Sequence, residues 1–113
     1  MKKNIEPYQD KSSIAIGYAR VSSTDNRQEL GLSVQTEALK FCDKLYIEKD
    51  SGGNRARPQL EKAMKMAKTY AKQGVKTNFA VYKLDRLTRK MFHLSAIIED
   101  LTNHGIRLQS LHE

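Results

Sequence analysis

The sequence lacks tryptophan, has one cysteine and two prolines, and contains no long hydrophobic run. A single cysteine excludes an internal disulfide and any metal site built from several thiolates. No apolar stretch approaches the roughly 20 residues of a membrane-spanning helix, and residues 1–12 lack the apolar core of a secretory signal. We therefore expect a cytoplasmic protein in which Cys42 is a small buried apolar side chain and residues 1–12 form a flexible leader.

Sequence motifs for nucleotide and metal chemistry are also missing. Neither GxxxxGK[ST] nor GxGxxG occurs, which argues against nucleotide hydrolysis and dinucleotide binding. The three histidines, His93, His104 and His112, do not combine with cysteines or acidic residues into a metal-binding spacing. We expect no cofactor and no metal.

The charge balance is strongly basic for a chain of 113 residues. Lysine and arginine number 20 against 13 acidic residues, which gives a net charge of +7 and a pI near 9.6. This balance favours an anionic partner, and double-stranded DNA is the first candidate. A basic protein without such a partner is the alternative that charge alone leaves open.

Apolar spacing predicts a single domain of alternating strands and helices, with no repeat and no linker. Strands are expected at residues 13–18, 46–50, 78–82 and 106–111, and helices at residues 32–45, 58–73 and 92–104. Ser33 is a candidate cap for the first helix. Pro58 suits the first turn of the second helix, and Gly74 and Gly105 are expected to end two helices.

This order predicts an α/β fold with three layers, in which a mainly parallel sheet of four to five strands is flanked by helices. Parallel sheets place functional sites at the carboxyl ends of their strands. The loops expected at residues 20–31 and 51–57, and the loop or short helix at residues 85–90, follow the first three strands. We therefore expect these three segments to meet at one edge, and the first two to be mobile without DNA.

The segment after the first strand carries a candidate nucleophile, Ser22, two residues beyond Arg20. The two residues lie on the same side of an extended chain. Serine needs activation to act as a nucleophile, and no histidine lies nearby to support acyl transfer. Arginine binds phosphate through a planar fork, so this pair suits attack on a phosphodiester. A chance pairing of surface residues is the alternative.

Other candidate site residues come from the later segments. Arg86 and Arg89 share a face if their segment is helical, and Asp85 either holds a guanidinium or takes part in proton transfer. A surface ion-pair cluster is the alternative. Arg57 and Arg55 are equal candidates on chemistry alone. Gln35, near the start of the first helix, either donates a hydrogen bond to a phosphate or is an exposed polar residue.

Lysines decorate one side of the second helix, at positions 62, 65, 68 and 72. Such a face is usually only solvated, and phosphate contact is the alternative.

Several motifs in order along the chain resemble the serine recombinases, the family of resolvases, invertases, large serine integrases and transposases. They are Tyr18-Ala-Arg-Val-Ser22, Gln35-Thr-Glu-Ala-Leu39, Asp50-Ser-Gly52, Arg57-Pro-Gln-Leu60 and Lys83-Leu-Asp-Arg-Leu-Thr-Arg89. The resemblance implies a resolvase-like catalytic domain over residues 13–113. It also implies a site-specific DNA recombinase that needs neither metal nor nucleotide.

The resemblance also assigns roles to individual residues. Ser22 matches the nucleophile that forms a 5′-phosphoserine link and releases a 3′-hydroxyl. Four arginines match the family's arginines that hold the scissile phosphate: Arg20, Arg57, Arg86 and Arg89. Asp85 matches an acidic residue implicated in positioning or proton transfer, and Gln35 matches a polar active-site position.

Family members continue into a long dimerisation helix and a DNA-binding domain, whereas this sequence ends at Glu113. The resemblance implies a homodimer that assembles into a synaptic tetramer in the full-length protein, and an isolated fragment that is expected to be impaired. A non-catalytic recombinase-like binding or regulatory module is the main alternative, although all four matching arginines are intact. A phosphorylated signalling domain would need clustered acidic residues at the strand ends, where arginines stand instead.

Overall fold

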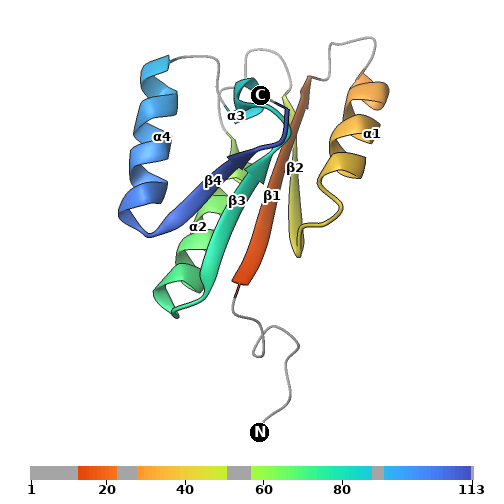
Figure 1. The fold of residues 1–113 in the computed structure, drawn as a ribbon. Coiled ribbons are helices and arrows are strands. Elements are labelled where there is room, and N and C mark those ends of the chain that lie inside the picture. The colour runs from red at the N-terminus through yellow and green to blue at the C-terminus, as the bar shows by residue number, and fades with distance from the viewer. Residues whose placement is uncertain (1–12, 23–27, 51–56, 88–90, 113) are drawn as a thin grey trace, which may run out of the picture.

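A computed structural model describes residues 13–22, 28–50, 57–87 and 91–112 of the chain (Figure 1). Within these ranges four strands alternate with helices. The strands are β1 (Ser13–Ser22), β2 (Lys44–Asp50), β3 (Lys76–Val81) and β4 (Ile106–Ser110). The helices are α1 (Gln28–Ala38), α2 (Pro58–Lys72), the short α3 (Leu84–Leu87) and α4 (Met91–Asn103).

The strands form one parallel sheet in the order β2-β1-β3-β4. Register pairs Tyr18 of β1 with Tyr46 of β2 and with Val81 of β3. Because a helical connection carries the chain back after each of the first three strands, and all pairings are parallel, the four carboxyl ends lie at the same edge. The predicted α/β class is confirmed, with four parallel strands between helices.

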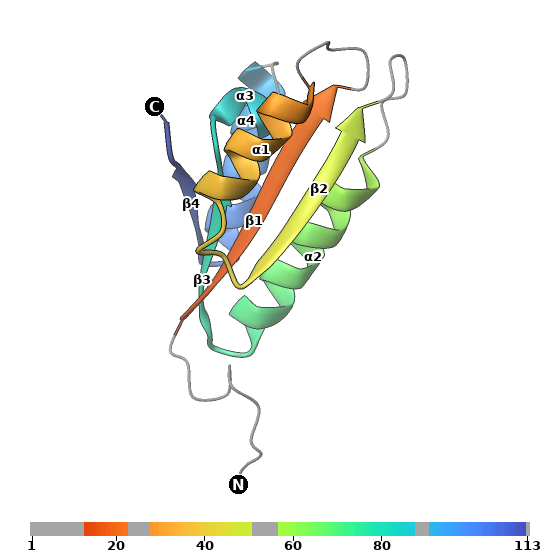
Figure 2. The same cartoon turned by 90° about the vertical axis from the view of Figure 1, so that its right-hand side faces the viewer.

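Helices cover both faces of the sheet, and Figure 2 shows α1 on one side and α2 on the other. The larger apolar cluster lies on the α2 side, where Ile16, Tyr18 and Phe79 of the sheet are fully buried. Leu101 of α4 joins the same cluster, so α2 and α4 share this face. A smaller cluster of Ala19, Leu39 and Ala80 lies on the other side. Burial of each large side chain contributes about 1.5–3 kcal/mol.

The second helix forms where its apolar spacing predicts. Its buried positions follow a helical period at Leu60, Ala63, Ala67 and Tyr70, and Pro58 occupies its first turn. The chain then turns through Gly74, whose φ of 88° favours glycine. The prediction that Gly74 ends this helix is confirmed, and Gly105 (φ 75°) follows α4 in the same way.

The first helix differs from the prediction at both ends. It begins at Gln28 and ends at Ala38, whereas apolar spacing predicted residues 32–45. Ser33 therefore lies inside the helix and does not cap it. The helix does not continue through residue 45, because Asp43 is bonded to β1. The backbone N–H of Asp43 donates to Ala15 O, and its Oδ2 accepts from Ala15 N, both at 2.9 Å. These bonds align the chain with β1, so β2 starts at Lys44.

The loop expected at residues 20–31 is also shorter than predicted. Residues 20–22 continue β1, and residues 28–31 belong to α1. The expected mobility of residues 24–27 and 51–56, and the leader at residues 1–12, lie outside the described residues. Among the helices that the structure describes, none combines the length and apolar character needed to cross a membrane.

Candidate active site

Three chain segments meet at the carboxyl edge of the sheet, as the topology predicts. β1 ends at Ser22, whose backbone is in register with Asp50 at the end of β2. The start of α2 and the short helix α3 lie at the same edge, at the top of Figure 1. Asp85 and Arg86 lie in α3. The backbone therefore gathers Ser22, Asp85 and Arg86 at one edge, whereas Arg89 lies outside the described residues.

Arg20 occupies a buried position of β1, only 6% exposed. Its backbone is held by Gln35 of α1, which is 2% exposed. Gln35 Oε1 accepts from Arg20 N at 3.2 Å, and Gln35 Nε2 donates to Arg20 O at 3.0 Å. Gln35 is thus neither an exposed polar residue nor the opening residue of its helix. Its amide ties α1 to the strand that carries Arg20 and Ser22.

Arg57 connects the start of α2 to the segment after β3. Its Nη1 donates a hydrogen bond to the backbone oxygen of Leu87, and Leu87 is fully buried in α3. The other candidate of this segment, Arg55, lies outside the described residues. A single guanidinium therefore fixes the beginning of one helix against the element that carries Asp85 and Arg86.

Glu48 is a residue at this edge that the sequence reasoning missed. It is 5% exposed in β2, in register with Arg20 of β1. Its Oε1 accepts from the backbone N–H groups of Gln59 and Leu60, each at 3.0 Å, and from the Tyr18 hydroxyl at 3.3 Å. A carboxylate from a strand thus satisfies free donors in the first turn of α2, where negative charge is favoured.

A sequence signal for Glu48 does exist. Along a strand, residues two apart share a face, so Tyr46, Glu48 and Asp50 belong to one row. An acidic residue between an aromatic residue and a strand end, ten residues ahead of Pro58, is unusual for a solvated face.

The Tyr18 hydroxyl lies within the electrostatic reach of both Arg20 and Arg57. Burial raises the pKa of the Tyr18 hydroxyl well above its usual 10.0, and the negative charge of Glu48 raises this pKa further. The charges of Arg57 and Arg20 oppose that shift. Both guanidiniums therefore act on the same buried ring, although they are 37 positions apart in the sequence.

The chemistry of this edge suits an anion. Arg20 lies in β1, which ends at Ser22, Arg57 lies at the start of α2, and arginine retains its charge in proteins. Within the residues that the structure describes, no group of three histidine, cysteine or acidic side chains is placed to bind a metal. Fixed guanidiniums suit a phosphate whose charge grows during a reaction.

Comparison with known proteins identifies the family of the chain. The family model described as "Resolvase, N terminal domain" matches residues 15–113. The chain is 36% identical over 96 residues to a DNA-invertase of Escherichia phage P1, a match that covers 85% of this chain and 47% of the invertase. It is 38% identical over 100 residues to the probable DNA-invertase y4cG of Sinorhizobium fredii, covering 87% of this chain and 30% of that protein.

A solved structure shares the fold. The serine recombinase from Sulfolobus solfataricus superposes with a TM-score of 0.68 at 27% identity, covering 89% of this chain and 69% of that one. The chain spans less than half the length of the two invertases that it matches.

Proposed function

Because the chain belongs to the resolvase and invertase family of serine recombinases, we propose that it is the catalytic domain, residues 13–113, of a site-specific DNA recombinase. In this proposal Ser22 is the nucleophile, and Arg20, Arg57, Arg86 and Arg89 bind the scissile phosphate of double-stranded DNA. The whole protein acts as a homodimer that assembles into a synaptic tetramer.

The observation that carries the proposal is the contact between Arg57 and Leu87 O. It links the start of α2 to the helix that holds Asp85 and Arg86, beside the strand that ends at Ser22. Phosphoryl transfer depends chiefly on positioning and on stabilising charge on the phosphate oxygens. A preorganised set of guanidiniums supplies both, because their dipoles and charges need no rearrangement during the reaction.

The proposed step exchanges one ester for another. The Ser22 Oγ bonds to phosphorus as the bond from phosphorus to the 3′ oxygen breaks, giving a 5′-phosphoserine link and a 3′-hydroxyl. The proton lost from Ser22 is balanced by the proton gained at the 3′ oxygen, with Asp85 as the candidate group for that transfer. The phosphodiester energy is conserved, so the reverse attack by a 3′-hydroxyl rejoins the strands without a cofactor.

Gln35 takes a different part in this proposal from the phosphate ligands. Both polar atoms of its amide are bonded to the backbone of Arg20. It therefore acts as a positioning residue that holds the end of β1 in place.

Covalent attachment to DNA tests the nucleophile. The chain, within the reading frame that encodes it, is incubated with a plasmid that carries the DNA flanking its gene, and denaturant-resistant protein–DNA complexes are measured. We expect Ser22→Ala to abolish them. The matched control is Ser33→Ala, because Ser33 is an exposed serine in α1. A Ser22→Ala protein that still becomes linked to DNA ends would contradict the assignment.

A further inference from the structure

A groove of about 780 Å³ runs between α2 and α4, from Glu61 in the first turn of α2 to Lys72 in its last turn. Met64 and Ala71 of α2 contribute apolar surface to it, and His104, just beyond α4, closes one end. The later turns of α2 approach the end of the sheet where strands begin, because Ser13 of β1 is in register with Lys76 of β3. The groove therefore extends toward the sheet edge opposite to Ser22.

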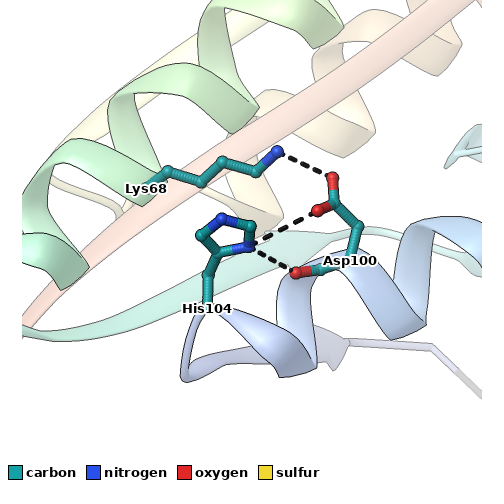
Figure 3. Close-up of polar contacts among 3 residues, drawn as sticks. All are labelled: Lys68, Asp100 and His104. Atoms are coloured by element: carbon teal, nitrogen blue, oxygen red, sulfur yellow. Dashed lines mark hydrogen bonds and ion pairs between the residues drawn. The ribbon is translucent and has the colours of Figure 1, made fainter.

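One lysine in the groove is neutralised. Figure 3 shows Lys68 of α2 reaching across to Asp100 of α4, with His104 facing the other oxygen of the same carboxylate. Lys68 Nζ lies 2.7 Å from Asp100 Oδ2, and His104 Nδ1 lies 3.4 Å from Asp100 Oδ1. His104 Nδ1 is also 2.8 Å from Asp100 O. The Lys68–Asp100 ion pair joins the two helices. Because Lys68 offsets the negative charge of Asp100, this carboxylate repels an anion only weakly.

Two other lysines of the groove have no acidic partner among the described residues. Lys65 and Lys72 are exposed, and within the described residues neither forms an ion pair or a side-chain hydrogen bond. They are seven residues apart, so they lie on the same side of α2 about 10 Å apart along its axis. Only Glu61, in the first turn of α2, adds an acidic group to this side of the groove.

We propose that the α2–α4 groove is a second DNA-binding surface, on which Lys65 and Lys72 contact backbone phosphates of duplex DNA independently of sequence. Lysine acts as a point charge toward phosphate and suits contacts without base readout. The net charge of +7 favours the same partner. An acidic peptide helix is the competing anionic partner, and one arm of the test below distinguishes it from DNA. This surface adds to the proposed function and does not depend on the chemistry of Ser22.

The salt dependence of DNA binding tests the proposal. The 113-residue chain is titrated with a duplex of unrelated sequence at several salt concentrations. Each phosphate contact contributes about 0.9 to the slope of log Kobs against log salt. We expect Lys65→Gln combined with Lys72→Gln to reduce the slope by about 2, and to weaken binding by about tenfold near 0.1 M salt.

The matched control removes the same charge elsewhere. Lys44 and Arg107 are exposed on strands, and Arg107 points away from the α2 side because its neighbour Leu108 packs into the α2 cluster. Lys44→Gln combined with Arg107→Gln is expected to leave the slope within about 0.5 of that of the unmodified chain. Equal losses in both double variants would overturn the proposal, and so would a chain that binds no duplex.

Two further readouts separate this surface from the alternatives. Amide NMR shifts caused by the duplex are expected at Lys65, Thr69 and Lys72, and their absence there would count against the groove. A polyglutamate peptide of matched charge is the probe for an acidic protein partner. Binding of this peptide that depends on Lys65 and Lys72, with no such dependence for DNA, would overturn the proposal. Ser22→Ala is expected to leave the slope unchanged, so failure of the covalent chemistry and failure of this surface are distinguishable.

Discussion

The side-chain amide of Gln35 forms two hydrogen bonds with the backbone of Arg20, donating to its oxygen at 3.0 Å and accepting from its nitrogen at 3.2 Å. The register between β1 and β3 ends at Tyr18 and Val81, two residues before Arg20. The Gln35 amide thus continues the pairing of β1 where the neighbouring strand stops. This arrangement stabilises the strand end that leads to Ser22.

Replacing Gln35 with leucine should destabilise the fold, because it leaves the buried N–H and C=O of Arg20 without these partners. An unsatisfied buried polar group costs about 1–3 kcal/mol, so we expect the free energy of unfolding to fall by at least that amount. Urea denaturation measures the change. Gln73→Leu, at an exposed position after α2, is the control, and equal stability of the two variants would rule out this role.

Replacing Glu48 with alanine should also destabilise the fold, because three donors lose one shared acceptor. Gln59 N and Leu60 N each lie 3.0 Å from Glu48 Oε1, and the Tyr18 hydroxyl lies 3.3 Å away. Hydrogen bonds to charged groups contribute about 1.5–3 kcal/mol, so we expect a loss of at least about 2 kcal/mol in urea denaturation. Glu48→Gln should lose less, since it retains an acceptor oxygen but not the charge favoured at a helix start.

The comparison for Glu48 is Glu99→Ala, because Glu99 is an exposed glutamate in α4. A loss for Glu48→Ala no larger than that for Glu99→Ala would show that the buried carboxylate does not anchor α2.

Replacing Arg57 with lysine separates its geometry from its charge. Lysine retains the positive charge but lacks the planar fork, so it is not able to hold Leu87 O and a phosphate together. We expect covalent DNA attachment by the encoded recombinase to fall by about 100-fold, a typical loss for a group that stabilises transition-state charge. Arg107→Lys, exposed on β4, should retain activity. Full activity of Arg57→Lys would exclude a role for the fork.

The reactivity of Cys42 should depend on pH in a shifted range. Burial, aided by the charge of Asp43, raises the pKa of the Cys42 thiol from 9.0 to about 11. Since the thiolate is the reactive form, alkylation of the folded chain should remain slow at pH 9 and rise toward pH 11. The same labelling in urea should rise about two pH units earlier. Coincident pH profiles in the two states would contradict this prediction.

The same shift links Cys42 to stability. The folded pKa is above the unfolded one, so the contribution of the neutral thiol is fully present below about pH 9 and is lost as the pH rises toward 11. Tyr18, whose pKa is also raised, adds a similar loss above pH 10. The difference in unfolding free energy between the unmodified chain and Cys42→Ala isolates the thiol, and it should shrink across pH 9–11.

Local sequence determined most of the architecture. Alternating and helical apolar spacings, with Pro58 at a helix start and Gly74 and Gly105 at helix ends, placed most elements to within a few residues, whereas the first helix ends at residue 38 instead of the predicted 45. The order of strands and helices then dictated a parallel sheet with its loops gathered at one edge, because parallel strands need crossover connections. The family was recognisable because its motifs follow one another in order along the chain.

Only the tertiary structure decided which polar side chains are buried and which groups form hydrogen bonds with them. Gln35 reads in the sequence as one more polar helix position, yet it is buried because its partner is a backbone 15 residues away. Glu48 was overlooked because the donors that justify its burial belong to a helix 11 and 12 residues later. The spacing of apolar residues indicates which side chains the hydrophobic effect buries. Gln35 and Glu48 are instead held inside by specific hydrogen bonds, which form only after the helices and strands have packed.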